Sequence, residues 1–290
     1  MSAVVTIVRD RTPHLRELVR GLERSTCAPS QLVVVAMGGE DPEPALREVT
    51  FPVRVMWCQA DDGLLPLARA RNLGITSVED DDHVVVLDVD CIPGRDLIAR
   101  YSFALDNLDA LFMGPVHYLD PGATEPGWRE ADLRRLSRPH PVRQAPAGPL
   151  PVRTDSYELF WSLSFAVRRE TFEDRIGGFD EALSGYGGED TDLAFSARSA
   201  GVPLAWVPGA IAYHQHHVTY APPLQHVRSI VDNARRFREK WGEWPMRGWL
   251  SAFRERDLIA WDPNGDRVVL LREPGVDEVA AARREHVLAG

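Results

Sequence analysis

The stretch VVVLDVDCIP, residues 84–93, joins four apolar residues directly to two aspartates one residue apart. The run from Val84 to Leu87 has the length and β-branched composition of a strand that is buried on both faces. Asp88 and Asp90 follow where that strand ends. A helix cap or a turn would account for one of them. Two carboxylates this close repel each other unless a cation lies beside them, and their hard oxygens suit Mg²⁺ or Mn²⁺.

The chain on either side of this stretch alternates short apolar runs with amphipathic segments. Further strands are predicted at 4–8, 32–35 and 53–57, and helices at 12–22, 64–75, 189–200 and 227–241. Buried strands that alternate with helices are typical of a parallel sheet covered on both faces. Ligands of such sheets bind beyond the carboxyl ends of the strands. The two aspartates lie at such an end.

Composition excludes several classes of protein. The 290 residues, 44% of them hydrophobic, suffice for one large domain or two small ones, and the net charge of −10 disfavours binding to nucleic acid. Three cysteines are an odd, sparse set that indicates a reducing compartment. No apolar run approaches the roughly 20 residues of a membrane span, and the N-terminus does not resemble a signal peptide. We therefore expect a cytoplasmic protein, with peripheral membrane association left open.

A second set of carboxylates occurs in residues 177–201, GGFDEALSGYGGEDTDLAFSARSAG. Glu189, Asp190 and Asp192 lie in the first turn of a predicted helix, behind a glycine-rich turn. The helix dipole favours one or two acids at that position. Three acids behind glycines that permit close backbone approach indicate a site that uses carboxylates. One of them could accept a proton from an attacking hydroxyl.

Three histidines occur within four residues, at 214, 216 and 217. A neutral imidazole is a good ligand for Mn²⁺. Alone, these histidines would be interpreted as a surface cluster. With the two aspartates present, a metal site with one histidine ligand is the better interpretation.

Two other segments differ from this pattern. Residues 119–155 are rich in Pro, Arg and Ala and predict a surface excursion with one helical piece at 128–136. Arg134, Arg135 and Arg138 in this excursion suggest contact with an anionic acceptor group, although an exposed basic helix would look the same. Near the C-terminus, Asn264-Gly265 predicts a hairpin turn, followed by a terminal helix at about 275–288.

In this order, the motifs resemble those of the family-2 glycosyltransferases of the GT-A fold, over roughly residues 3–245. The triplet Asp88-Val89-Asp90 before Ile92-Pro93 and the motif Gly187-Gly188-Glu189-Asp190 are similar to those of the β-1,4-galactosyltransferases. Tyr213-His214-Gln215 resembles the metal-histidine region of the bacterial chondroitin-type polymerases.

The resemblance implies a Rossmann-like α/β fold with a mixed, mostly parallel central sheet and helices on both faces. It also implies a division of the chain. One GT-A domain would span residues 1–250. It would comprise a nucleotide-binding half at 1–118, a variable excursion at 119–155 and an acceptor half at 156–245. A C-terminal extension would follow at 251–290.

The resemblance further implies an inverting hexosyltransferase that uses Mn²⁺ or Mg²⁺ and a nucleotide-diphosphate sugar, with a UDP-sugar favoured. Asp90 and His214 would bind the metal, with Asp88 and His216 as further candidates. The nucleotide sugar would contact the residues that match the family's donor motifs, namely Val8, Arg9, Asp10, Arg71, Asn72, Asp88, Val89, Asp90 and Gly188.

On the acceptor side, Asp190 would be the catalytic base and Glu189 would hold acceptor hydroxyls. Trp161 would form part of the sugar platform, although a core Trp would look the same. Residues 216–223 would act as a lid over the donor. The acceptor is an unknown hydroxyl compound, and the C-terminal hairpin or helix is a candidate surface for a homodimer.

One departure leaves the nucleotide open. Most family-2 members carry an aspartate pair after the second strand, whereas residues 36–41 here read Ala-Met-Gly-Gly-Glu-Asp. Glu40 or Asp41 could substitute, and GDP or dTDP remain alternatives to UDP. Two other functions use similar parts: a nucleotidyltransferase or phosphohydrolase with the same Asp-x-Asp metal site, and a non-catalytic sugar-nucleotide-binding protein.

Overall fold

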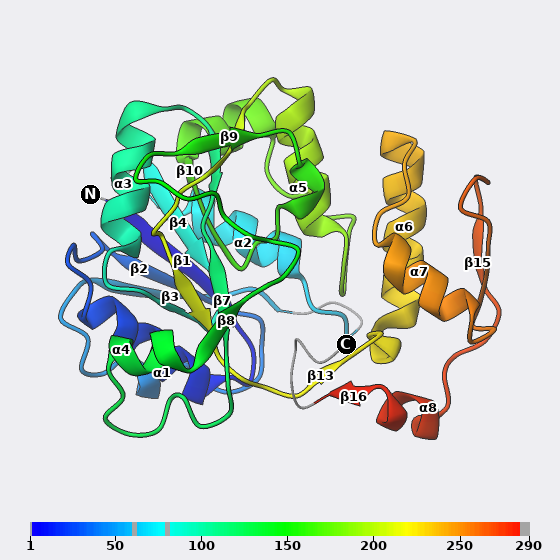
Figure 1. The fold of residues 1–290 in the computed structure, drawn as a ribbon, viewed down its shortest axis with the longest axis horizontal. Coiled ribbons are helices and arrows are strands. Elements are labelled where there is room, and N and C mark those ends of the chain that lie inside the picture. Colours follow the sequence, from blue (N-terminus) through cyan, green and yellow to red (C-terminus); the bar gives the residue numbers. More distant parts are fainter. Residues whose placement is uncertain (1, 60–62, 79–81, 285–290) are drawn as a thin grey trace.

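The computed structural model describes residues 2–59, 63–78 and 82–284. An eight-stranded sheet forms its centre, in the order β3-β2-β1-β4-β10-β6-β11-β9 (Figure 1). The strands are β1 (Ala3–Val8), β2 (Leu32–Ala36), β3 (Val53–Trp57), β4 (His83–Leu87), β6 (Leu111–Met113), β9 (Val152–Thr154), β10 (Ser164–Arg168) and β11 (Leu204–Trp206). Strands β9 and β10 run antiparallel to their neighbours, and the other pairings are parallel. The predicted mixed, mostly parallel sheet is therefore confirmed.

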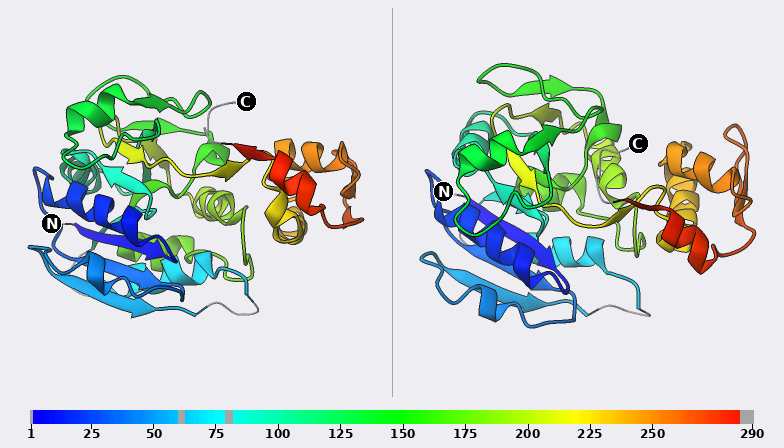
Figure 2. Two further views of the ribbon diagram at one scale, coloured as in Figure 1. Left: turned by 90° about the horizontal axis from the view of Figure 1, so that it is seen from below. Right: turned by 60° about the horizontal axis from the view of Figure 1, so that its bottom comes forward.

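Helices cover both faces of this sheet, as the alternation of strands and helices predicts (Figure 2). Helices α1 (Thr12–Glu23) and α3 (Leu97–Asn107) pack on one face, and α2 (Leu67–Thr76) and α5 (Glu189–Ser199) pack on the other. Strand β1 contributes side chains to the cores on both faces of the sheet. Val5 and Ile7 enter one core, and Val4 and Val8 enter the other. The quoted stretch forms β4, which lies between β1 and β10.

A smaller sheet continues from the aspartate triplet. Its order is β5-β12-β7-β8, formed by β5 (Cys91–Pro93), β12 (Ala212–His214), β7 (Val116–Leu119) and β8 (Ser137–Pro139). Cys91 pairs with His214 in the antiparallel β5–β12 register. The stretch 204–213, predicted as one strand-like segment, therefore splits between β11 and β12 in different sheets. The smaller sheet brings the histidine segment next to Asp90.

The 119–155 excursion contains more regular structure than its composition predicts. The helical piece is α4 (Glu130–Arg135), and its flanks supply β8 to the smaller sheet and β9 to the edge of the central sheet. Both strands have mostly exposed side chains. Their pairing is carried by the backbone, so hydrophobic periodicity gives no signal for them.

The C-terminal lobe, defined here as residues 224–284, has a hydrophobic core of its own and lies beside the main body (Figures 1 and 2). It comprises η4 (Leu224–His226), α6 (Val227–Trp241), α7 (Arg247–Arg254), the hairpin β14 (Ile259–Trp261)–β15 (Val268–Leu270), α8 (Val276–Ala281) and β16 (Arg283–Arg284). The predicted hairpin is confirmed.

The terminal helix ends earlier than predicted, at Ala281, because β16 pairs with β13 (Thr219–Tyr220). This β13 strand lies within the segment predicted as a lid. Residues 285–288 of the predicted helix lie outside the described residues. Short 3-10 or π-helical turns complete the fold: η1 (Glu43–Ala45), η2 (Tyr157–Leu159) and η3 (Thr171–Ile176). No helix within the described residues is both long enough and apolar enough to cross a membrane.

Candidate active site

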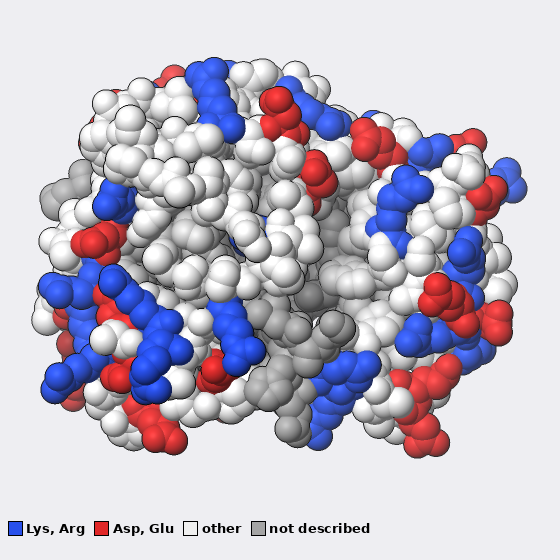
Figure 3. Space-filling view, in the orientation of Figure 1, with Lys and Arg blue, Asp and Glu red and all other residues white. Residues whose placement is uncertain are grey.

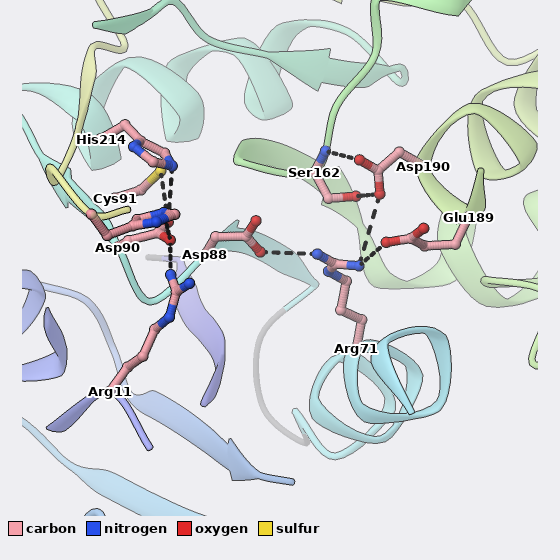
Figure 4. A network of polar contacts seen from close by, with 10 residues as sticks. Arg11, Arg71, Asp88, Asp90, Cys91, Ser162, Glu189, Asp190 and His214 are labelled. Carbon is pink, nitrogen blue, oxygen red and sulfur yellow. Dashed lines mark hydrogen bonds and ion pairs between the residues drawn. The ribbon is translucent and has the colours of Figure 1, made fainter. Parts of the chain in front are cut away.

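Two groups of polar side chains face each other beyond the carboxyl end of β4 (Figure 4). One surrounds Asp90, and the other surrounds Arg71 on α2. Asp88 and Asp90 share the loop between β4 and β5, and they point to different groups. Asp88 Oδ1 accepts a hydrogen bond from Arg71 Nη2 at 3.0 Å, whereas Asp90 turns toward the histidine segment.

The Asp90 group has the atoms of a metal site. Asp90 is only 6% exposed, and its carboxylate lies 3.6 Å from His214 Nε2 and 3.3 Å from His217 Nε2. One oxygen and two nitrogens lie within 4.8 Å of one another. His216 is not part of this group. Because β12 ends at His214 and the chain then turns, His217 comes back toward Asp90, which spacing along the sequence does not predict.

The ionisation of this group suits a divalent cation. Burial would raise the pKa of Asp90, but its interactions with His214, His217 and Arg11 outweigh burial and hold the pKa well below its usual range. Burial lowers the pKa of His214 to about 4, against the opposing effect of Asp90. At neutral pH the group therefore offers a carboxylate and neutral imidazole, the ligating forms. The Arg11 guanidinium also contacts the Asp90 carboxylate, so a cation is already favoured there.

The mixed oxygen and nitrogen set fits a transition-metal ion such as Mn²⁺ better than Mg²⁺, which prefers oxygen ligands alone. These residues therefore fit the predicted metal. Asp88, a further candidate for a metal ligand, instead forms an ion pair with Arg71.

The second group gathers three carboxylates around one buried arginine. Arg71 is 4% exposed and lies 3.0 Å from Asp88, 3.2 Å from Glu189 and 3.8 Å from Asp190. Burial alone would lower the pKa of Arg71, but the three carboxylates raise it above its usual value. The resemblance predicts a nucleotide contact for Arg71. The structure places its guanidinium between the Asp-x-Asp loop and the start of α5, where it links the two halves of the site.

The carboxylates of this group do not all lose their protons easily. Burial and the neighbouring Asp190 raise the pKa of Glu189 to about 7, with Arg71 opposing them. Burial raises the pKa of Asp88 to about 6, again against Arg71. A single guanidinium therefore does not fully offset the cost of burying these carboxylates.

Asp190 is held at both oxygens by one residue. The Ser162 backbone N–H donates to Oδ2 at 3.1 Å, and the Ser162 hydroxyl donates to Oδ1 at 2.9 Å. Each carboxylate oxygen has two lone pairs, and the hydrogen bond from Ser162 uses only one of them. The carboxylate can therefore still accept a proton from a hydroxyl. No pattern in the sequence predicts a role for Ser162. Its position next to Trp161, the predicted platform residue, was the available signal.

The third acid of the first turn of α5 has a structural role. Asp192 is buried and accepts hydrogen bonds from Lys240 Nζ at 2.9 Å and from Trp241 Nε1 at 2.7 Å. Both partners come from α6. Asp192 therefore fastens α5 to the C-terminal lobe and does not face the other carboxylates.

Arg143, from the 119–155 excursion, is a further residue that the sequence analysis missed. It is 1% exposed, its Nε donates to Leu159 O at 2.8 Å, and its guanidinium lies 5.0 Å from the ring centre of Trp161 and 5.3 Å from that of Trp206. No ion pair within the described residues involves this arginine. A buried cation between two aromatic faces fixes Trp161 and the loop that carries Ser162.

The exposed arginines of the same excursion are paired instead. Arg134, Arg135 and Arg138 lie within ion-pair distance of Glu130, Asp132 and Asp120. Figure 3 shows basic side chains over the α1–α4 side of the molecule, with acidic ones among them. Such ion pairs between exposed side chains are typical of a solvated surface.

The remaining predicted donor residues lie around the end of β1 and on α2. Val8 is buried at the end of β1, and the Asp10 carboxylate accepts a hydrogen bond from the Glu40 N–H at 2.9 Å. The two turns that follow β1 and β2 are thus joined, and Arg9 lies 3.6 Å from Asp10. Asn72, in contrast, bonds the backbone of Phe179 at 2.8 and 2.9 Å, away from the carboxylates around Arg71. Of the other two, Val89 is buried in the Asp-x-Asp loop, and Gly188, at φ +96°, is the N-cap residue of α5.

The loop before α5 rests on the C-terminal lobe. Asn233 Nδ2 donates to Ser184 O at 3.1 Å and to Gly187 O at 2.8 Å, and the Tyr186 ring stacks on His226 with 4.6 Å between ring centres. Gly187 has φ +94°, and a Cβ there would lie 2.8 Å from Met246 Sδ. Only glycine fits this conformation and this close contact. The lobe therefore sets the path of the chain into Glu189 and Asp190.

Comparison with known proteins gives one family. The model of the family described as "Glycosyltransferase like family 2" matches residues 7–243. Chondroitin synthase of Escherichia coli is 26% identical over 213 residues, which cover 63% of this chain and 30% of that protein. The chain thus spans less than a third of the length of that relative.

Solved structures show the same fold at low identity. The structure of GalNAc-T7 with UDP, GalNAc and Mn²⁺ superposes with a TM-score of 0.57 at 16% identity, covering 89% of this chain and 57% of that one. The mannosyltransferase PcManGT from Pyrobaculum calidifontis, in complex with GDP-Man and Mn²⁺, gives a TM-score of 0.53 at 16% identity, covering 87% and 68%. The fold is accordingly GT-A-like.

Proposed function

The chain belongs to the glycosyltransferase-like family 2, and from this premise we propose that it moves a hexose from a nucleotide-diphosphate sugar to an acceptor hydroxyl, with a divalent metal and with inversion at the anomeric carbon. The observation that carries the proposal is the arrangement of two groups across one strand end. Asp90, His214 and His217 can hold a cation, and Asp190 lies opposite them, linked through Arg71 and Asp88 (Figure 4).

The metal, when bound by Asp90, His214 and His217, would neutralise charge on the diphosphate of the donor. The other steps belong to the chain's own residues. Asp190 would accept the proton of the acceptor hydroxyl, which requires an approach of about 2.6–3.2 Å in the productive complex. Ser162 keeps the Asp190 carboxylate in one orientation through two hydrogen bonds. One in-line displacement opposite the leaving diphosphate then inverts the configuration.

Glu189 would hold an acceptor hydroxyl beside the base. Its pKa near 7 means that it can donate or accept a hydrogen bond at neutral pH. Trp161, held by Arg143, would offer an aromatic face to the acceptor or donor ring. Arg11, already on Asp90, would turn to the diphosphate as a cation enters the site.

The nucleotide remains open between UDP and GDP. The GalNAc-T7 structure contains UDP and the PcManGT structure contains GDP-Man, so the GT-A-like fold is compatible with either. Beside the first two strand ends, Asp10 and Glu40 are joined, and these residues would read the base or ribose. We favour UDP.

The test is a thermal-shift screen of UDP, GDP, dTDP and CDP, each with and without Mn²⁺, followed by measurement of nucleotide release from the matching donor sugars. We expect a metal-dependent shift with one nucleotide and release that rises with an acceptor. Nucleotide binding without turnover of any donor would favour the non-catalytic alternative. The absence of any metal-dependent shift would refute the proposal.

A further inference from the structure

A cavity of about 690 Å³ lies outside both groups of the candidate active site. It is an open depression lined by the end of β3, one side of α2 and the segment 172–181. The carboxylates around Arg71 and Asp90 do not line it. Its volume falls within the range of about 300–1,000 Å³ that is typical of small-molecule sites. Helix α2 separates the two places, because Arg71 turns into the carboxylate group whereas Asn72 lines the cavity.

One wall of the cavity is a large exposed aromatic side chain. Trp57, the last residue of the edge strand β3, is 48% exposed. Among the described residues its ring stacks on no other ring. Tryptophan buries a large apolar surface when it packs, so leaving half of it in water is costly. A flat apolar face beside polar groups is the surface on which the apolar face of a sugar ring rests.

The opposite side of the cavity offers hydrogen-bonding groups with unused capacity. Glu181 Oε1 accepts from Asn72 Nδ2 at 2.9 Å, and Glu173 Oε1 pairs with Arg169 at 3.3 Å. The hydrogen bonds between described residues use only one oxygen of each carboxylate. Gln59 and Thr76 add an amide and a hydroxyl to the lining. Acceptor oxygens and amide groups together suit a ligand with several hydroxyls.

The charge of the described lining residues disfavours an anionic ligand. Among the described lining residues, Arg69 is the one cation, against Glu173 and Glu181. The formal charge of −1 disfavours phosphate or carboxylate groups, and the single ring platform favours one pyranose over an extended apolar molecule.

We propose that this cavity is a second carbohydrate-binding site, which takes a neutral pyranose ring on Trp57 with its hydroxyls on Glu181 and Glu173. The ring could belong to a longer saccharide that also reaches the candidate active site or to a free sugar, and the two sources share this chemistry. The cavity wall at 177–181 leads directly into the loop 184–188 before Asp190. The proposal goes beyond sugar transfer and does not depend on it, because binding is measured without a donor.

The experiment titrates the full chain with methyl β-glucoside, methyl β-galactoside, methyl β-N-acetylglucosaminide and methyl β-glucuronide, and with the disaccharides lactose and cellobiose. Saturation-transfer NMR and tryptophan fluorescence report binding. Each titration is repeated with saturating UDP and Mn²⁺ and in the Asp190→Asn variant, both of which address the candidate active site. Trp57→Ala removes the platform, and Trp57→Phe keeps an aromatic face.

Phe103→Ala is the matched control, because Phe103 is also 48% exposed and lies on α3, over the other face of the sheet. We expect at least one neutral glycoside to bind, with affinity that falls about tenfold in Trp57→Ala and less in Trp57→Phe. Phe103→Ala, UDP with Mn²⁺ and Asp190→Asn should leave it unchanged. Tighter binding of the disaccharide than of its monosaccharide units would identify the longer saccharide as the source, and equal binding would identify the free sugar.

Several results would overturn the proposal: no binding of any neutral glycoside, binding unaffected by Trp57→Ala, preference for the glucuronide, or competition by UDP with Mn²⁺. Glu181→Gln provides a second variant, for which we expect weaker binding without loss of the fluorescence signal. Sugar binding at Trp57 in a protein that turns over no donor would refute the proposed function and leave this inference standing.

Discussion

Replacing Glu189 with Gln tests the electrostatics of the site through the stability of the unliganded protein. Burial raises the pKa of Glu189 from 4.5 to about 7. A carboxyl with a higher pKa in the folded state contributes stability that is complete below its unfolded pKa and is lost as pH rises through its folded value. The wild-type protein therefore loses this contribution between about pH 4.5 and pH 7, whereas the uncharged amide of Glu189→Gln does not titrate.

The size of the effect follows from the shift. A displacement of about 2.5 pKa units at 1.36 kcal/mol per unit corresponds to about 3 kcal/mol. The free energy of unfolding of Glu189→Gln minus that of wild type should rise by roughly this amount from pH 4.5 to pH 8. Any hydrogen bond to Arg71 that the amide weakens adds an offset that does not depend on pH.

Urea unfolding at several pH values, followed by circular dichroism, measures the difference. Glu158→Gln is the control for the removal of a carboxyl group, because Glu158 is exposed on η2. Parallel curves for wild type and Glu189→Gln would show that Glu189 is ionised in the folded protein at the same pH as in the unfolded chain. The description of the carboxylate group would then be wrong.

Four further substitutions test the proposed roles. Asp190→Asn should abolish sugar transfer while donor binding stays within about twofold, as measured by nucleotide release and calorimetry; transfer at the normal rate would remove Asp190 as the base. Asp90→Ala should weaken nucleotide binding in the presence of Mn²⁺ but not in its absence, and an unchanged metal dependence would contradict its role. Arg143→Met and Ser162→Ala should each slow turnover about tenfold, and the double variant should be no slower than the slower single one, because both act on the orientation of Asp190. Additive losses would show that Arg143 acts by another route.

The sequence predicts the framework of the site because the framework depends on local patterns. The apolar run before Asp88 identifies a central strand, and the acids behind Gly187-Gly188 identify a helix start, so both carboxylate pairs fall at the ends of regular elements. Strands β8 and β9 escape prediction, since their pairing is made by the backbone of largely exposed segments.

The partners of these carboxylates depend on contacts between distant parts of the chain. His217 reaches Asp90 only because the chain turns after β12, and periodicity contains no information about that turn. Ser162 and Arg143 both come from the chain before α5. Ser162 bonds Asp190 although 28 positions separate the two residues in the sequence. The motif predicts Arg71 as a residue of the site, but its three carboxylate neighbours come from two separate segments, the loop after β4 and the first turn of α5.

The support of the 184–188 loop by the C-terminal lobe has a consequence for how this protein can be divided. The family model ends at residue 243, whereas Met246, which lies against Gly187, comes after that point. A fragment cut at the family boundary would keep Asp90, Asp190 and the Asn233 hydrogen bonds to the loop, but would lose the contact of Met246 with Gly187. We expect such a fragment to bind nucleotide and turn over slowly.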